Sequence, residues 1–287
     1  MSAAPLDELV VTDATTGAVE EIRFVDVGDS EQLYTVHHRA ATVAADRPLA
    51  SIVLASSIGA SRERGHRSIV DLARALAAAG HHVLRFDYRG IGESGGAFEE
   101  HGFTSWRCDL ERAIELLRDR AGASPLGVWG VRGGALLASE VFSAGLAGGA
   151  MLCAPMDGQA LLQDILRRTL VADMMARPHA KRTPREEIIA GFERGESSIV
   201  DGYRWTRLLW TDAADHRIAF PSEPQPTWRV VDFKGLPKTA LPPALERCRE
   251  IETGERFWES TPRLIPRTRS LADKTLAWAR SLTEGSR

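Results

Sequence analysis

The feature that most constrains this 287-residue chain is an apolar run that breaks at a glycine cluster and then resumes. The run spans 126–138 and reads LGVWGVRGGALLA. Its first half has the length and composition of a strand, and its second half has helical composition. Glycine allows a sharp backbone turn and a close approach of neighbouring backbones. The stretch therefore predicts a strand, a tight turn and a helix, with Arg132 in the middle of the turn.

The turn has the spacing of a nucleophile elbow, in which small residues stand two positions before and two positions after the nucleophile. The small residues are Gly130 and Gly134, and Arg132 stands between them, flanked by Val131 and Gly133. A guanidinium is not deprotonated in a protein and has no lone pair with which to attack a carbonyl. The sequence thus predicts a hydrolase scaffold that has no nucleophile at the centre of its elbow.

Composition and charge exclude several classes of function. With 44% hydrophobic and 26% charged residues the chain is typical of a soluble globular protein, and its net charge of -3 argues against a nucleic-acid partner. No stretch of about 18 apolar residues and no apolar leader are present, so we expect a cytoplasmic protein without membrane insertion. The three cysteines Cys108, Cys153 and Cys248 are far apart, so we expect neither disulfides, nor a metal site, nor a cofactor.

Apolar runs alternate with helical periodicity through most of the chain, which predicts an α/β fold with a mostly parallel sheet and helices on both faces. Alternating residues at 19–27 and 32–40 predict an antiparallel N-terminal hairpin. Further strands are predicted at 49–55, 82–88, 126–131, 150–154, 227–233 and 248–253, and helices at 68–79, 103–120 and 270–282.

The pattern changes between 157 and 226. Residues 161–176 and 184–194 are predicted helices, and three prolines, Pro221, Pro224 and Pro226, end the segment. We interpret 157–226 as a helical cap inserted into a core formed by 1–156 and 227–287.

A second glycine-rich turn, GESGG at 92–96, matches G-x-S-x-G letter for letter and offers Ser94 as a nucleophile. The mechanism requires a helix that opens at the serine, whereas 97–102 continues as a loop. We therefore interpret Ser94 as part of a connection that follows a strand.

The stretch RFDYRGIGESG at 85–95 resembles the strand-and-loop signature of α/β-hydrolases of the serine aminopeptidase S33 type. More narrowly, the chain is similar to the hydrolase-like proteins of bacterial exosortase A and exopolysaccharide systems, the kind called hydrolase 2. The matching stretches are 62–79, the loop around Gly92, WGVR at 129–132, DGYR at 201–204 and Phe257-Trp258. The resemblance implies an α/β-hydrolase fold and arginine as a group feature of the elbow.

The resemblance also indicates where a catalytic triad would stand. Its nucleophile falls on Arg132, and its acid normally follows the strand at 227–233, where Asp232 still lies inside the strand. Its histidine is expected between the last strand and the last helix, but all eight histidines lie at or before His216. A nucleophile needs a base within hydrogen-bond reach and a carboxylate that orients the base. The triad is therefore expected to be degenerate.

Two unconventional nucleophile and base pairs remain open. Ser56 or Ser57 lies in the loop that normally supplies an oxyanion donor, with His66 as a base, and Cys153 combines with a histidine of the cap such as His179. A cysteine on an apolar strand is more often a core residue.

The elbow places Arg132 at a helix start, where backbone N–H groups favour an anion. Its planar guanidinium suits a carboxylate or a phosphate, and Arg62 or Arg64 could add to such a site. The candidate pocket residues are Arg132, Val131, Gly133, Ser57, Ile58, Arg62 and Arg64.

The alternative is that Arg132 forms an internal ion pair with Glu93, Asp87 or Asp157 and fills the former pocket, because an uncompensated buried cation is costly.

Three candidate functions follow from these two roles of Arg132 and from the unconventional nucleophile and base pairs. The first is a protein without standard serine-hydrolase activity that binds a small anionic or acyl ligand, or a partner, in exopolysaccharide or exosortase systems. The second is an ester or thioester hydrolase with an unconventional residue set, and the third is a structural interaction module.

Overall fold

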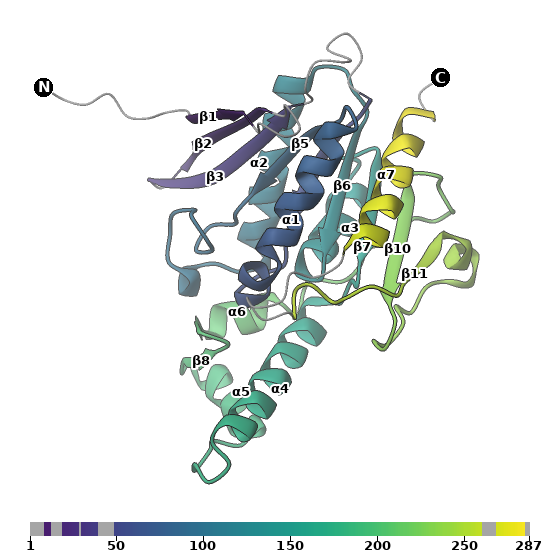
Figure 1. Ribbon diagram of the computed structural model, residues 1–287. Helices are drawn as coiled ribbons and strands as arrows, with labels where there is room; N and C mark the ends of the chain where they lie inside the picture. The colour runs from purple at the N-terminus through teal and green to yellow at the C-terminus, as the bar shows by residue number, and fades with distance from the viewer. Residues whose placement is uncertain (1–8, 13–18, 29, 40–48, 260–267, 285–287) are drawn as a thin grey trace, which may run out of the picture.

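A nine-stranded sheet forms the centre of the computed structural model, which describes residues 9–12, 19–28, 30–39, 49–259 and 268–284 (Figure 1). The strand order is β1-β2-β3-β5-β4-β6-β7-β10-β11. The strands are β1 (Leu9–Thr12), β2 (Val19–Gly28), β3 (Glu31–Arg39), β4 (Ser51–Ala55), β5 (His82–Phe86), β6 (Leu126–Val131), β7 (Gly149–Cys153), β10 (Trp228–Phe233) and β11 (Arg249–Glu252).

The sheet is mixed, and its antiparallel part lies at the N-terminal end. Strands β1, β2, β3 and β5 pair antiparallel in that order, whereas β5, β4, β6, β7, β10 and β11 pair parallel. The predicted antiparallel hairpin forms as β2 and β3, and the mostly parallel sheet is confirmed; residue 40 of the predicted second strand lies outside the described residues. Strand β1 was not predicted, because four residues beside a polar tail carry little periodicity.

Helices cover both faces of the sheet, as predicted (Figure 1). Helices α1 (Ala60–Ala78) and α7 (Arg269–Glu284) pack on one face, and α2 (Phe103–Ala121) and α3 (Gly133–Ser143) pack on the other. Each faces the sheet with an apolar stripe, for example Trp106, Leu110, Ala113, Ile114 and Leu117 of α2.

Helix α1 begins at Ala60, eight residues before the predicted start at Ser68. Its first two turns, ASRERGHR, carry no helical stripe of apolar residues, and tertiary ion pairs hold them instead. The guanidinium of Arg62 bonds Asp87 at the end of β5, with Nε 2.9 Å from Oδ1. A polar stretch of this kind looks like a loop in the sequence, because its partners lie far away along the chain.

The segment between β7 and β10 projects beyond the carboxyl ends of the parallel strands (Figure 1). It contains the predicted helices α4 (Gly158–Ala176) and α5 (Arg185–Arg194). It also contains a short hairpin, β8 (Ser198–Val200) and β9 (Tyr203–Trp205), and helix α6 (Arg207–Asp212), none of which was predicted. The division into a core and a cap at 157–226 stays an interpretation, which this placement favours.

Candidate functional site

The elbow forms between β6 and α3. Arg132 occupies the turn with φ 53° and ψ −113°, which a side-chain-bearing residue rarely adopts. Close packing enforces the turn, since a Cβ on Gly134 would clash with the backbone oxygens of Ala55 and Ser56. A Cβ on Gly130 would clash with the backbone of Gly134. The two small residues of the motif therefore have the steric role that the sequence predicts.

Arg132 is buried, with 1% of its surface exposed, and its partner comes from α4. Its Nη2 donates to Oδ2 of Asp164 at 2.6 Å, while its Nε is buried without a hydrogen-bond partner among the described residues. Burial lowers the pKa of Arg132. Asp164, rather than Glu93, Asp87 or Asp157, is the carboxylate that compensates this cation.

Asp164 is the centre of a larger ion network. Arg167 Nη2 donates to its Oδ1 at 2.8 Å, and Arg168 Nε lies 3.1 Å from its Oδ2. Burial alone raises the pKa of Asp164, but Arg132 and the other two cations outweigh it and hold that pKa below its usual value. Arg168 also donates to Glu259 at 3.1 Å, so the network joins the elbow, α4 and the segment after β11.

Apolar side chains fill the space that faces the first residue of α3. A Cβ built on Gly133 would lie 3.1 Å from Leu161 and 3.4 Å from Ile58. Ile58, Val131 and Ser57 are all buried, and the Oγ of Ser57 has no hydrogen-bond partner among the described residues. These predicted site residues cluster around the elbow, but they present little polar surface to a substrate.

A cavity of about 570 Å³ lies beside the elbow, at the carboxyl ends of β7 and β10. One part of its wall is apolar, and another part carries five cations and three carboxylates. The apolar part includes Met156, Ile218, Phe220, Phe233 and Leu236; the cations are Arg132, Arg167, Arg217, Lys238 and Arg256; the carboxylates are Asp157, Asp164 and Asp232. Five cations against three anions leave a net charge of +2 on the wall, in a chain whose net charge is -3.

Asp232, at the position nearest to a catalytic acid, is already bound to other groups. It lies inside β10, and its Oδ1 accepts hydrogen bonds from the backbone N–H and the hydroxyl of Thr239 at 3.1 and 2.7 Å. Its Oδ2 pairs with Arg249 of β11. Its carboxylate is therefore part of the support of the β10–β11 edge.

Arg62 and Arg64 are not brought to Arg132. Arg62 pairs with Asp87, and Arg64 donates to Asp201 Oδ2 at 2.6 Å and to the carbonyl of Trp258 at 3.2 Å. Neither lines the cavity. Their ion pairs join α1 to the end of β5 and to the β8–β9 turn, and the hydrogen bond of Arg64 to Trp258 joins it to the segment after β11.

The unconventional nucleophile and base pairs are not assembled either. Cys153 is fully buried in β7, and burial raises the pKa of its thiol well above the ordinary value, which suppresses the thiolate. His179 is exposed between α4 and α5. His66 is exposed on α1, and burial of part of its ring lowers its pKa. Ser57 Oγ makes no hydrogen bond to it.

Ser94, in the second glycine-rich turn, has a structural role. Its hydroxyl donates to the carbonyl of Asp87 at 2.5 Å and accepts the backbone N–H of Tyr34 at 2.9 Å. The first bond joins the turn to the end of β5 and the second joins it to β3, which agrees with the interpretation of this motif as a connection.

A cluster of hydrogen-bonded polar residues around His216 was not predicted from the sequence. His216 Nδ1 lies 2.9 Å from Glu140 of α3, and its Nε2 lies 3.1 Å from Oγ1 of Thr104. That hydroxyl donates to Asp212 at 2.5 Å. Burial alone lowers the pKa of His216, but Asp212 and Glu140 outweigh it and raise that pKa to about 9. The imidazole is therefore a cation near neutral pH and not a base that could activate Thr104.

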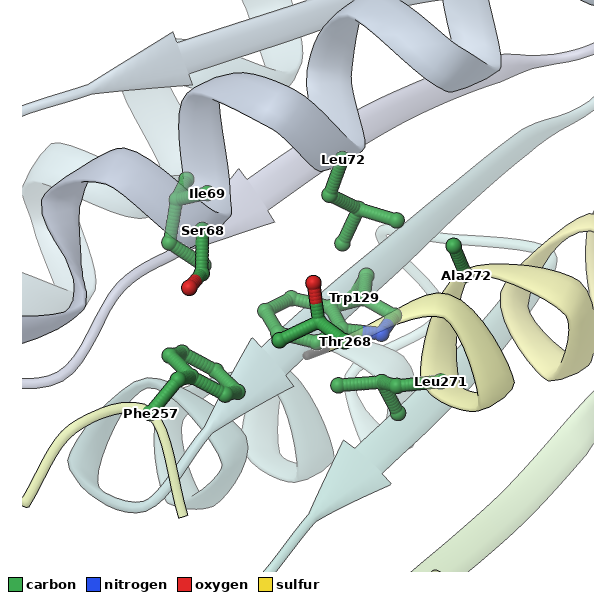
Figure 2. A pocket seen from close by; sticks show the side chains of 8 residues that line it. All are labelled: Ser68, Ile69, Leu72, Trp129, Phe257, Thr268, Leu271 and Ala272. Carbon is green, nitrogen blue, oxygen red and sulfur yellow. The ribbon is translucent and has the colours of Figure 1, made fainter. Parts of the chain in front are cut away.

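A second, very small cavity lies between α1 and α7, over Trp129 of β6 (Figure 2). Figure 2 shows the indole between Leu72 and Leu271. The volume of about 10 Å³ holds one water at most, so this cavity is a packing gap. Within the described ranges, no group of three or more His, Cys, Asp and Glu residues could hold a metal ion, and no helix could cross a membrane.

Curated relatives match a short part of the chain. The lysophosphatidylserine lipase ABHD12 of Danio rerio is 39% identical over 72 residues, which are 25% of this chain and 18% of that protein. The protein of the same name from Gallus gallus is 36% identical over 72 residues, again 25% of this chain and 18% of that protein. The match thus spans less than a fifth of these relatives.

Solved structures match more of the chain at lower identity. An α/β serine hydrolase without lid from Xanthomonas campestris is 15% identical, with a TM-score of 0.47 over 88% of this chain and 85% of that chain. An α/β serine hydrolase homologue from Coxiella burnetii is 12% identical, with a TM-score of 0.48 over 93% and 97%.

A family model described as serine aminopeptidase, S33, matches residues 49–211, which include the elbow, the turn around Ser94 and helices α4 and α5. The matched stretch is more than half of the 287 residues, and the strand order agrees with a mostly parallel α/β-hydrolase sheet. This chain belongs to the serine aminopeptidase S33 family of α/β-hydrolases.

Proposed function

We propose that this protein lacks standard serine-hydrolase activity and binds a small anionic or acyl ligand in the cavity beside the elbow. The observation that carries the proposal is Arg132, a buried guanidinium at the position of the nucleophile. The absence of any histidine after His216 in the sequence supports it, and so does the engagement of Asp232 with Arg249. An arginine cannot form an acyl-enzyme, but it binds carboxylates and phosphates well.

The wall of the cavity supports a ligand that has both an anionic and an apolar part. Its net positive charge favours an anion, and Met156, Phe220 and Phe233 offer apolar surface to a chain or a ring. Pockets that combine apolar surface with a few convergent polar groups are typical of small-molecule sites.

The first test is a panel of short and medium acyl esters and thioesters with the purified protein. We expect no turnover above that of buffer, and an active α/β-hydrolase serves as the positive control. Turnover that disappears on Ser57→Ala or Cys153→Ala would overturn the proposal and establish a hydrolase with an unconventional residue set.

The second test is thermal stabilisation by carboxylates, phosphates and acyl-CoA compounds. At a ligand concentration 100 times Kd, binding should stabilise the folded state by about 2.7 kcal/mol and raise the Tm. Arg132→Ala should abolish the shift, whereas Arg112→Ala, at an exposed ion pair with Glu115 on α2, should preserve it. No shift with any of these anions in the wild type would remove the support for binding.

A second candidate, a structural interaction module with a filled site, is favoured by the internal Arg132–Asp164 pair and by Leu161 over Gly133. If the pair serves only stability, Arg132→Ala should lower the free energy of unfolding by about 3 kcal/mol, the usual cost of breaking a buried ion pair. Asp164 keeps Arg167 and Arg168 in either case, so the two candidates differ in their response to a ligand. The filled site expects this loss in urea unfolding together with no rise of the wild-type Tm on addition of any anion, whereas the binding proposal expects that rise.

The resemblance to exosortase-associated proteins supports a place for the ligand in cell-surface polysaccharide export. Deleting the gene in the source organism should lower exopolysaccharide yield, and the Arg132→Ala protein should not restore it. An unchanged yield in the deletion strain would contradict this placement.

A further inference from the structure

Asp164 occupies the place where a ligand's own carboxylate would bind to Arg132. Its Oδ2 accepts from Nη2 of Arg132 at 2.6 Å, and both residues line the cavity. The contact uses one nitrogen of the guanidinium. The Nε of the same group is buried without a partner among the described residues, so Arg132 has an unused donor beside the used one.

A free carboxylate could satisfy Arg132 better than Asp164 does. Two parallel hydrogen bonds from Nε and Nη2 to the two oxygens of one carboxylate form the preferred bidentate arrangement. A group bound in this way would place a second carboxylate oxygen on Nη2, next to Asp164 Oδ2. Two carboxylates side by side repel each other in a site of low dielectric constant, so we expect the ligand to displace Asp164 from Nη2.

The withdrawal of Asp164 does not leave its charge unpaired. Arg167 Nη2 lies 2.8 Å from Oδ1, and Arg168 Nε lies 3.1 Å from Oδ2, so two cations of the same helix stay with it. The side chain of Asp164 is already 18% exposed. A stranded buried carboxylate would oppose such an exchange, and these two arginines prevent that cost.

We propose that the ligand is a small carboxylic acid with an apolar tail, and that its carboxylate exchanges with Asp164 on Arg132 and thereby loosens helix α4. This inference rests on the proposed function, because it assigns a ligand class and a regulation to the same cavity. The tail lies against the apolar wall that includes Met156, Phe220 and Phe233. Helix α4 is the element that loosens, because Asp164 joins it to Arg132 of the elbow and Arg168 joins it to Glu259.

The test is a calorimetric titration of the full chain with straight-chain carboxylates from acetate to decanoate. Hexanol serves as the uncharged control, and hexyl phosphate tests the alternative anion. Wild-type protein should bind the medium-chain carboxylates. Asp164→Asn, which removes the competing charge, should bind them about tenfold more tightly. Asp173→Asn is the matched control, because Asp173 also pairs with two arginines of this segment, Arg177 and Arg182, but does not line the cavity.

The outcomes distinguish a failure of the exchange at Asp164 from a failure of the proposed function. Equal affinity of wild type and Asp164→Asn for hexanoate overturns the exchange and leaves the proposed function standing. A preference for hexyl phosphate over hexanoate overturns the ligand class. No binding of any anion by wild type, Asp164→Asn or Asp173→Asn overturns the proposed function itself.

Hydrogen exchange on the wild-type protein gives a second readout that does not depend on the folding of a variant. Saturating hexanoate should accelerate amide exchange in α4 at 158–176 and slow it in the loop at 234–240 beside the cavity. Unchanged or slower exchange in α4 at saturation overturns the loosening of this helix.

Discussion

Arg132 keeps a strained backbone at a position where a nucleophile would gain from it. A residue with a side chain in a sparsely populated region of φ and ψ costs on the order of 1–3 kcal/mol. The close passage of Gly134 past Ala55 and Ser56 fixes the turn, so the strain persists independently of the residue at its centre. The steric role of the elbow is thus separable from its chemical role.

Gly134→Ala tests this steric role. The added methyl group would meet the backbone oxygens of Ala55 and Ser56, which cannot move without distorting β4. We expect the free energy of unfolding to fall by about 3 kcal/mol, at the upper end for an overpacked site. Gly148→Ala is the control, because its nearest atom would lie at 3.4 Å in an exposed connection. Similar urea midpoints for the two variants would show that the turn is not sterically fixed.

The sequence allowed the burial cost of Arg132 to be predicted, but not its partner. Asp87 and Asp157 were plausible partners by position, yet Asp87 binds Arg62, and Asp157 accepts the backbone N–H of Ile218. Asp164 became the partner because α4 lies over the elbow, and helix placement depends on packing between segments. Its position three residues after Leu161, which packs on Gly133, was the available signal.

Among the elements, the end of α6 and the connection after it are joined to α2 and α3 by polar and charged side chains. Asp212 accepts the backbone N–H of Thr104 at 3.0 Å and so caps the first turn of α2. His216 then joins this group to Glu140 of α3. Three elements that are far apart in the sequence meet at a single imidazole.

The stability of the protein should depend on pH through His216. The pKa is raised from 6.5 to about 9 in the folded protein, so folding favours the protonated form. The contribution, on the order of 3 kcal/mol, is fully present below the unfolded pKa and is lost as pH rises through the folded pKa. Wild-type stability should therefore fall between pH 6.5 and about 9.

Urea unfolding across this pH range checks the expectation. His216→Gln should be less stable than wild type near pH 6 and should lack the alkaline decline. His179→Gln, at an exposed histidine of the same segment, should match the wild type. An alkaline decline that persists in His216→Gln would assign the dependence to another group.

The long elements could be predicted because their own residues carry the pattern. Strands β4, β6 and β7 are apolar runs, β5 and β10 are mostly apolar, and α2 and α7 have clear amphipathic stripes. The short hairpin β8–β9 and helix α6 lack enough residues for a periodicity. They form because Val200, Trp205 and Trp210 pack into the main core, which is information that only the folded chain contains.

At the scale of the molecule, one core joins the two parts that the sequence analysis separated. The larger hydrophobic cluster contains side chains of α2 and α3, such as Ile114 and Leu136, together with Leu161 and Leu166 of α4 and Trp210 of α6. The segment at 157–226 therefore packs its buried apolar side chains against α2 and α3 instead of forming a core of its own.

A shared core predicts one cooperative unfolding transition. Tryptophan fluorescence and far-UV circular dichroism should follow the same urea curve, as in two-state unfolding. The Trp205→Phe/Trp210→Phe variant, in which the remaining tryptophans lie outside 157–226, should keep the same transition midpoint within the cost of the substitutions. An earlier, separate transition of Trp205 and Trp210 would make that segment an independent domain.

The ion pair between Asp232 and Arg249 has a consequence for any attempt to build a catalytic triad on this chain. Arg132→Ser alone would place a hydroxyl on the turn without a base, because the sequence after His216 contains no histidine. A serine triad on this scaffold would need a serine at 132, a histidine between β11 and α7, and a carboxylate freed from the β10–β11 edge. Because Asp232 supports that edge through Arg249, a designed variant that frees its carboxylate should also lose stability.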